Sequence, residues 1–261
     1  MPDLREMKRR GEKIAVLTAY DYLFARIVDG AGVDVVLVGD SLGHVVLGLD
    51  TTLPVTLGDM IHHARAVRRG VERALLVVDL PFLSYQVSRE DALRNAGRVL
   101  QETGAAAVKL EGGTPAIAST VRAMVEVGIP VMGHLGYTPQ SVQMLGVRVQ
   151  GRDDANRQRL KDEARRLEDA GAFSIVLELV PGDLAQEITD SLSIPTIGIG
   201  AGVGCDGQVL VLHDMLGLNR DFTPKFLRKF AELGDAAQDA CGGFVQAVKG
   251  GEYPAAEHTF A

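Results

Sequence analysis

Acidic side chains end five of the apolar runs in this 261-residue sequence. They are Asp40, Asp79, Glu111, Glu178 and Asp214. A carboxylate buried at the end of a strand costs free energy unless it is paired or bound to a metal ion. Carboxylates with no cysteine nearby are hard oxygen ligands of the kind that Mg²⁺ prefers, and Mg²⁺ keeps waters or substrate oxygens in its other octahedral positions. The set therefore predicts a divalent-metal site formed by Asp40, Asp79 and Glu111.

Each of these three acids, taken alone, also has a purely structural interpretation. Asp40 could cap a following helix, because Asp is favoured at that position. Asp79 could be a turn residue, and Glu111 could form a structural ion pair with Lys109. Side chains alternate along a strand, so Lys109 and Glu111 should point to the same side. The alternation predicts a cation and an anion together at the end of one strand.

The histidines divide by position. His134 follows Gly133 at the end of an apolar run and could polarise a carbonyl group or donate to a carboxylate, unless it is a satisfied structural histidine. His62 and His63 lie in a segment with helical character, where a surface position is expected. His213–Asp214 is interpreted as structural. Only His134 becomes a candidate site residue.

Eight short apolar runs, each followed by a helix-like segment, must position these residues. The runs are Ala15–Thr18, Val33–Gly39, Ala74–Asp79, Ala106–Glu111, Pro130–His134, Phe173–Glu178, Thr196–Gly200 and Val209–His213. Their nearly continuous hydrophobicity is typical of strands buried on both faces of a parallel sheet. In a chain of this length the alternation predicts an α/β fold, a (β/α)₈ TIM barrel formed by one catalytic domain over residues 1–261. An open doubly wound sheet is the alternative. In a barrel, residues at the carboxyl ends of the strands are the catalytic candidates.

Local signals predict where several helices begin and end. Ser88 and Asp91 have capping-box spacing at the start of a segment that reaches Gly104. Thr114–Pro115 and Thr223–Pro224 each place a capping residue before a proline at the first helical position. From Asp153, an apolar stripe predicts a helix that stops at Gly171. The stripe consists of Leu160, Ala164, Leu167 and Ala170.

Composition excludes several classes of protein. The net charge is −7, from 27 basic and 34 acidic residues, which disfavours nucleic-acid binding. No apolar stretch approaches the ~18 residues of a membrane-spanning helix, and the polar N-terminus lacks a signal-peptide core. Two cysteines, Cys205 and Cys241, make neither a disulfide framework nor a metal cluster. We therefore expect a cytoplasmic protein that binds neither nucleic acid nor membranes.

The glycine-rich stretch Gly198–Gly204 leaves two interpretations open. Loops after the seventh and eighth strands of a barrel can hold phosphate, but the stretch fits neither a Walker motif nor the dinucleotide fingerprint. Close approach of the backbone over the barrel mouth accounts for the glycines equally well.

Together, a set of short motifs resembles the ketopantoate hydroxymethyltransferase (3-methyl-2-oxobutanoate hydroxymethyltransferase) family over nearly the whole chain, from Thr18–Asp21 to Gly251–Pro254. The motifs between these ends are Val38–Ser41, Thr52–Thr56, Asp79–Phe82, Lys109–Gly113, Gly133–Gly136, Thr138–Gln140, Val149–Gly151, Ile197–Gly202, Asp206–Gln208 and His213–Asp214. The resemblance implies a TIM barrel of the phosphoenolpyruvate/pyruvate type. It also implies pantothenate biosynthesis: transfer of a hydroxymethyl group from 5,10-methylenetetrahydrofolate to 3-methyl-2-oxobutanoate through an enolate that Mg²⁺ stabilises. The expected ligands are therefore a small keto acid, a folate co-substrate and Mg²⁺.

The resemblance also assigns roles to residues. It implies that Asp40, Asp79 and Glu111 ligate the metal, and that Asp40, Ser41, Asp79 and Lys109 hold the keto acid. Glu178 would be the base that removes the proton from C3, with Lys109 and His134 as supporting catalytic residues. A homo-oligomer, a decamer built from dimers, is expected on the same ground.

Three departures from the family pattern bear only on loop geometry and folate-side contacts: Tyr137 stands where the family usually has leucine, the Gly146–Val149 loop is slightly short, and Cys205 lies in a loop that often carries other residues. Two rival functions remain. One is a Mg²⁺-dependent keto-acid aldolase or lyase of the same superfamily, and the other is a non-catalytic keto-acid-binding barrel.

Overall fold

The computed structural model describes residues 3–260, which divide into two compact units. The first unit ends at Val211 and the second begins at Leu212. The expectation that residues 1–261 form one catalytic domain stays a prediction.

Eight parallel strands of the first unit form a closed barrel, because β1 pairs with both β2 and β8. Within residues 3–260 the strands are β1 (Ile14–Thr18), β2 (Val35–Val38), β3 (Leu75–Asp79), β4 (Ala107–Glu111), β5 (Val131–Gly136), β6 (Ser174–Glu178), β7 (Thr196–Ile199) and β8 (Gly207–Leu210). The predicted TIM barrel is confirmed, and the open-sheet alternative is wrong because the ladder closes on itself.

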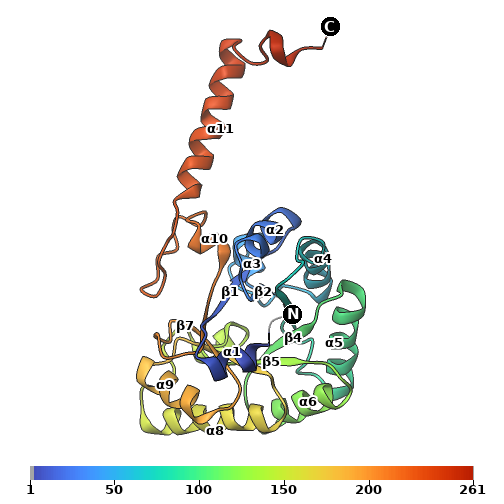
Figure 1. Ribbon diagram of the computed structural model, residues 1–261, viewed down its shortest axis with the longest axis vertical. Helices are drawn as coiled ribbons and strands as arrows, with labels where there is room; N and C mark the ends of the chain where they lie inside the picture. Colours follow the sequence, from blue (N-terminus) through green and yellow to red (C-terminus); the bar gives the residue numbers. More distant parts are fainter. Residues whose placement is uncertain (1–2, 261) are drawn as a thin grey trace. The chain divides into compact units, whose positions relative to one another are not determined.

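Helices lie along the outside of the barrel, as α5, α6, α8 and α9 show in Figure 1. Those of the first unit are α1 (Leu4–Arg10), α2 (Tyr22–Gly30), α3 (Leu42–Val45), α4 (Leu57–Arg68), α5 (Arg89–Thr103), α6 (Pro115–Glu126), α7 (Val142–Leu145), α8 (Asp154–Asp169) and α9 (Gly182–Ser191), with a 3₁₀ turn η1 (Pro139–Ser141). The four residues of the stripe predicted for α8 are all buried.

Three of the predicted helix starts are confirmed by their caps. Ser88 accepts a hydrogen bond from the backbone N–H of Asp91 at the start of α5, and Gly104 ends that helix with φ 71°. Thr114 caps α6 and Asp153 caps α8 by the same kind of bond to the third residue of each helix. These caps satisfy N–H groups that have no partner inside the helix.

The link between β7 and β8 departs from the predicted strand–helix alternation. Among the described residues, no helix lies between Ile199 and Gly207. Gly200 and Gly202 have φ values of 61° and 80°, in the left-handed region that glycine adopts without strain. These conformations turn the chain back to the barrel within a few residues.

The last predicted strand and the last predicted helix are wrong in their positions. The strand β8 ends at Leu210, and His213 lies in the short helix α10 (Leu212–Met215). No helix starts at Thr223–Pro224; instead, the N–H of Leu227 closes a turn on the carbonyl of Pro224. The local cap-and-proline pattern formed a turn and was not extended into a helix.

The second unit also contains α11 (Leu233–Gly250) and a 3₁₀ turn η2 (Ala256–His258). No residue of α11 is buried in the structure. In the portion described, residues 3–260, no helix has both the length and the apolar character needed to cross a membrane.

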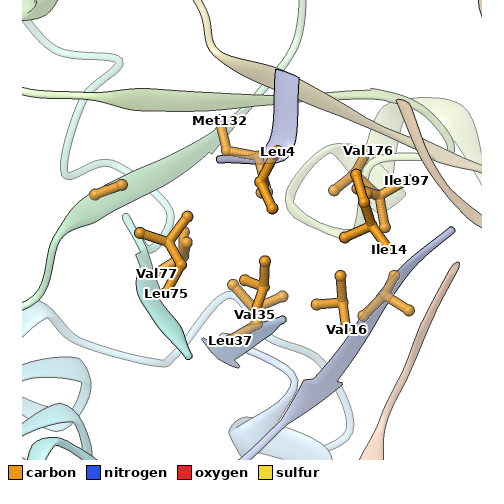
Figure 2. Packing of buried hydrophobic residues seen from close by; sticks show 12 residues of the cluster. Leu4, Ile14, Val16, Val35, Leu37, Leu75, Val77, Met132, Val176 and Ile197 are labelled. Carbon is orange, nitrogen blue, oxygen red and sulfur yellow. The ribbon is translucent and has the colours of Figure 1, made fainter. Parts of the chain in front are cut away.

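Inward-facing side chains from the strands form an apolar cluster inside the barrel (Figure 2). Leu4 of α1 is part of it and lies among the strand side chains (Figure 2). On β3, Leu75 and Val77 belong to this cluster, and the alternation of side chains puts Asp79 on the same face. The barrel interior therefore changes from apolar to charged toward the carboxyl ends of its strands.

Candidate active site

The register of the strands brings the predicted polar residues side by side. Asp79 of β3 pairs with Lys109 of β4, and Glu111 of β4 pairs with His134 of β5. On β6, Glu178 is paired with Gly136 of β5. Since adjacent parallel strands lie less than 5 Å apart, these side chains share one end of the barrel.

Lys109 forms its ion pair with Asp79. The Lys109 Nζ lies 2.7 Å from Asp79 Oδ1, and both side chains are buried. Asp79 Oδ2 accepts a hydrogen bond of 3.1 Å from the backbone N–H of Asp40. Lys109 is thus paired with Asp79 rather than with Glu111, and Asp79 is more than a turn residue. Asp79 instead joins the ends of β2, β3 and β4.

Asp40 does not cap the helix that follows it. Its Oδ2 accepts a hydrogen bond of 2.9 Å from the side chain of Gln140. The backbone N–H of Gln140 donates to Glu111 Oε2 at 3.0 Å. Tyr85 adds to the same network, because its hydroxyl donates to Gln140 Oε1 at 2.8 Å and accepts from the N–H of Glu111 at 3.1 Å.

His134 lies between two carboxyl groups. Its Nδ1 is 3.5 Å from Glu111 Oε1, and its Nε2 is 3.2 Å from Glu178 Oε2. Burial, assisted by the charge of Lys109, holds the pKa of His134 well below its usual 6.5. A neutral imidazole has one N–H and one acceptor nitrogen, so it can donate to only one of these carboxyl groups. The other carboxyl group can interact with it favourably only when it carries a proton.

Burial raises the pKa of three carboxyl groups in this cluster. It is the largest cause at each of them and raises the pKa of Asp40 to about 7 and that of Glu178 to about 8. Burial also raises the pKa of Glu111, and the neighbouring charge of Asp40 is the second cause. Lys109 lowers the pKa of all three groups, but it is only one cation.

Because burial and mutual repulsion raise these pKa values, the carboxyl groups ionise together only with a further cation beside them, and a hard divalent cation fits that need. Asp40, Asp79, Glu111 and Glu178 surround one ammonium group, and carboxylate oxygens are the ligands that Mg²⁺ prefers. Across residues 3–260, no three His, Cys, Asp or Glu side chains are arranged to hold one ion. Mg²⁺ commonly binds through one or two carboxylates and completes its octahedron with waters and substrate oxygens. The donor chemistry fits, and the assignment of Asp40, Asp79 and Glu111 as ligands stays a prediction.

Ser41 lies beside the cluster at the end of β2. Its Oγ is 2.8 Å from the hydroxyl of Tyr20. The stretch Gly39–Gly43 has the G-x-S-x-G spacing of a nucleophile elbow. Such an elbow requires a histidine at the serine oxygen, and here the oxygen bonds a tyrosine. This hydrogen bond gives no support to a nucleophilic role, and the keto-acid-binding role of Ser41 stays a prediction.

The chain turns sharply after Glu178. Leu179 has φ 48°, an uncommon conformation for a residue with a side chain. Its N–H donates to the carbonyl of Ile199, and its carbonyl accepts from the N–H of Gln150. These bonds hold the strained turn directly behind the carboxyl group of Glu178.

Two residues of the site were not found by sequence reasoning. Gln140 appeared only as the end of a family motif, and Tyr85 was not singled out. Both are neutral side chains in connections that follow a strand, Gln140 in the 3₁₀ turn η1, so neither charge nor strand alternation points to them. Asp214 and His213 lie in α10 of the second unit, and their structural role stays a prediction. His63 bonds the carbonyl of Tyr20 and has no part in the carboxylate cluster.

The glycine-rich stretch is explained by close packing. A Cβ at Gly204 would meet Gln186 Oε1 at 2.4 Å, and one at Gly198 would meet Cys205 Sγ at 3.0 Å. These are side-chain atoms, whereas a Cβ at Gly202 would meet the backbone Cα of Gly182 at 3.1 Å, which agrees with close approach of the backbone. The phosphate interpretation stays untested.

Solved structures with a similar fold define the class of barrel. A phosphonopyruvate hydrolase complex with oxalate and Mg²⁺ is 13% identical with a TM-score of 0.62, over 94% of this chain and 97% of that one. A 2,3-dimethylmalate lyase, described as a member of the PEP mutase/isocitrate lyase superfamily, is 18% identical with a TM-score of 0.60, over 100% and 93%. The chain thus shares the TIM-barrel fold of these two proteins.

Sequence relatives define the family within this class. The family described as ketopantoate hydroxymethyltransferase matches residues 1–256. A 3-methyl-2-oxobutanoate hydroxymethyltransferase of Syntrophus aciditrophicus is 59% identical over 98% of this chain and 94% of its own. One from Chloroflexus aurantiacus is 56% identical over 98% and 91%. The chain belongs to the ketopantoate hydroxymethyltransferase family and is an enzyme of the transferase class, which confirms the resemblance found in its motifs.

Proposed function

We propose that this enzyme transfers a hydroxymethyl group from 5,10-methylenetetrahydrofolate to 3-methyl-2-oxobutanoate and so makes 2-dehydropantoate for pantothenate biosynthesis. The names of its close relatives support the keto-acid substrate, and the family resemblance of the motifs supports the folate donor. One structural observation carries the proposal. A buried carboxyl group with a raised pKa, Glu178, shares a barrel end with a buried lysine–aspartate pair and further carboxylates.

Asp40, Asp79 and Glu111 would hold Mg²⁺ in this proposal, directly or through its bound waters. When bound, Mg²⁺ supplies Lewis-acid polarisation of the keto-acid oxygens, which makes the C3 proton more acidic. The buried carboxylates supply the negative charge that such an ion requires, and Lys109 leaves that charge only partly compensated.

Lys109, Asp40, Ser41 and Asp79 would bind the keto acid. The Lys109 ammonium group is fixed by its 2.7 Å contact with Asp79 and carries positive charge toward the oxygen on which negative charge develops. Its pKa is raised by the neighbouring carboxylates, Asp79 foremost, against the opposing effect of burial. Lys109 therefore stays charged throughout the reaction.

Glu178 would take the proton from C3. A base works best when its pKa lies near the working pH, and burial raises the pKa of Glu178 to about 8. His134 Nε2 lies 3.2 Å from Glu178 Oε2 and would be a supporting residue beside the base. Carbon C3 then bonds to the methylene carbon of the donor, both carbon–nitrogen bonds of that methylene group break, and water supplies the hydroxyl oxygen. The proton taken from C3 and one proton of the water end on the two nitrogens of the tetrahydrofolate that leaves.

An assay of tetrahydrofolate release together with 2-dehydropantoate formation tests the proposal. The purified enzyme should make both products in equal amounts with Mg²⁺ and lose activity in EDTA. Cleavage of a keto-acid substrate without folate would indicate the aldolase or lyase alternative. Binding of 3-methyl-2-oxobutanoate with no turnover of any kind would indicate the non-catalytic alternative.

The homo-oligomer expected from the family resemblance also belongs to this proposal. Sedimentation of the purified protein would test it, since a monomer at micromolar concentration would contradict it.

A further inference from the structure

The side-chain amide of Gln140 uses its full hydrogen-bonding capacity inside the site. Its Nε2 donates to Asp40 Oδ2 at 2.9 Å and to the carbonyl of Leu80 at 3.0 Å. Its Oε1 accepts from the Tyr85 hydroxyl at 2.8 Å and from Gln86 Nε2 at 3.1 Å. A carboxamide has two N–H donors and two acceptor lone pairs, so all four are occupied.

The partners leave only one orientation for this amide. Asp40 Oδ2 and the carbonyl of Leu80 are both acceptors, so a flipped amide would turn its own oxygen toward them. Gln140 is only 5% exposed, and a buried acceptor that is left without a hydrogen-bond donor costs about 1–3 kcal/mol. The Nε2 group therefore stays directed at Asp40, and one oxygen of that carboxylate is held in place.

The same residue also holds a second acid of the cluster. The backbone N–H of Gln140 donates to Glu111 Oε2 at 3.0 Å. Behind it, the Tyr85 hydroxyl accepts from the N–H of Glu111 while donating to the Gln140 amide. One loop residue, supported by one tyrosine, thus connects the ends of β2, β3 and β4.

We propose that Gln140 is a positioning residue, which fixes the carboxylates of Asp40 and Glu111 in the orientation needed for the metal and the keto acid. This inference rests on the proposed function, because it assumes that these two acids are ligands. Gln140 acts through them, and Tyr85 acts through Gln140. Outer partners of metal ligands commonly contribute 10–100-fold to metal affinity.

Binding of Mn²⁺ in place of Mg²⁺ tests the inference without any turnover. Mn²⁺ affinity is measured by water-proton relaxation or electron paramagnetic resonance, with 3-methyl-2-oxobutanoate present, for wild type and Gln140→Met. Methionine is close to glutamine in size but cannot form the four bonds. We expect Mn²⁺ to bind at least about tenfold more weakly to the folded variant.

Gln150→Met is the matched control. Gln150 is also 5% exposed and lies in the same β5–α8 connection, but among residues 3–260 its side chain donates only to the carbonyl of Arg148. The Gln150→Met variant removes a buried glutamine side chain that forms no hydrogen bond to an acid of the cluster. Its Mn²⁺ affinity should therefore stay within about twofold of wild type. Equal loss of affinity in both variants would assign the effect to the loop as a whole and overturn the inference.

Tyr85→Phe gives a second route if Gln140→Met does not fold. It removes one bond to the amide and one to the N–H of Glu111, and we expect about three- to tenfold weaker Mn²⁺ binding. Unchanged affinity in folded Gln140→Met or in Tyr85→Phe would refute the positioning role. Failure of the wild type to form 2-dehydropantoate would refute the proposed function instead, and the binding measurements would still report on Gln140.

Discussion

The two ends of the barrel interior are lined by the same strand faces but by opposite kinds of residue. On β4, Ala107 belongs to the apolar cluster, and Lys109 and Glu111 continue the same face. On β5 and β6, Met132 and Val176 each precede a polar residue by two positions, His134 and Glu178 respectively. The apolar end can be closed by α1, whose Leu4 packs into it (Figure 2).

The comparison separates stability from function within one barrel. Burial of the side chains at the apolar end stabilises the folded state, by about 25 cal/mol for each square ångström of apolar surface removed from water. At the charged end, burial raises the pKa of Asp40 to about 7 and of Glu178 to about 8, which shows that ionisation there costs free energy. The apolar end supports the fold, and the charged end is held in place by it.

The largest expected effect is the loss of proton abstraction at the charged end. Glu178→Gln keeps the shape of the side chain and removes the base, so exchange of the C3 proton of 3-methyl-2-oxobutanoate in deuterated water should slow by about 10²–10⁴-fold. Proton NMR measures the exchange. The variant should still bind the keto acid with Mg²⁺, and exchange at the wild-type rate would remove Glu178 from its proposed role.

A substitution at the apolar end should give the opposite pattern. Ile197 of β7 is fully buried, and Ile197→Ala should lower the free energy of unfolding by about 2–5 kcal/mol. Urea unfolding followed by circular dichroism measures this loss. Because the side chain lies in the apolar cluster, the Mg²⁺ concentration for half-maximal activity should change less than about twofold. A large change in Mg²⁺ requirement would show that the two ends are not separable.

The order of strands and the polar residues at their ends could be predicted from the sequence. Strands buried on both faces are continuous apolar runs, and alternation placed Lys109 and Glu111 on one side. The contact of Lys109 with Asp79 rather than with Glu111 depends on the register between β3 and β4, which no single strand encodes. For the same reason, Gln140 and Tyr85 could not be found, since their partners lie up to 100 residues away.

Errors cluster where local patterns have more than one three-dimensional outcome. The run Val209–His213 contains both the end of β8 and the start of α10, and hydrophobicity does not mark the boundary. At Thr223–Pro224, proline suits the first turn of a helix and also a tight turn, and the chain forms the turn.

A smaller effect is expected on the pH dependence of stability. Burial raises the pKa of Glu178 in the folded protein from the ordinary 4.5 to about 8, so the folded state holds this proton more tightly than the unfolded state does. The contribution of the protonated Glu178 carboxyl group to the free energy of unfolding is fully present below about pH 4.5 and is lost as the pH rises through 8. Glu178→Gln, which stays neutral, should therefore melt several degrees above the wild type at pH 9 and close to it at pH 4.5.

Thermal unfolding in EDTA at the two pH values makes this comparison. EDTA removes any bound divalent ion, so the measurement reports on the carboxyl group alone. A difference in melting temperature that does not grow with pH would contradict the raised pKa of Glu178.

The smallest expected effect concerns the ion pair that Lys8 of α1 forms with Asp206. Lys8 Nζ lies 2.9 Å from Asp206 Oδ2 and 2.8 Å from the carbonyl of Thr189, with about one sixth of each charged side chain exposed. Lys8→Met should cost about 1 kcal/mol, because it leaves part-buried acceptors without their donor while water can still reach them. Arg9→Met on the same helix removes a far more exposed ion pair with Glu6 and should change stability by less than about 0.5 kcal/mol. Neither variant should alter Mn²⁺ binding, because both lie on α1 at the apolar end; a loss of Mn²⁺ affinity in Lys8→Met would show that the charged end depends on the closure of the apolar one.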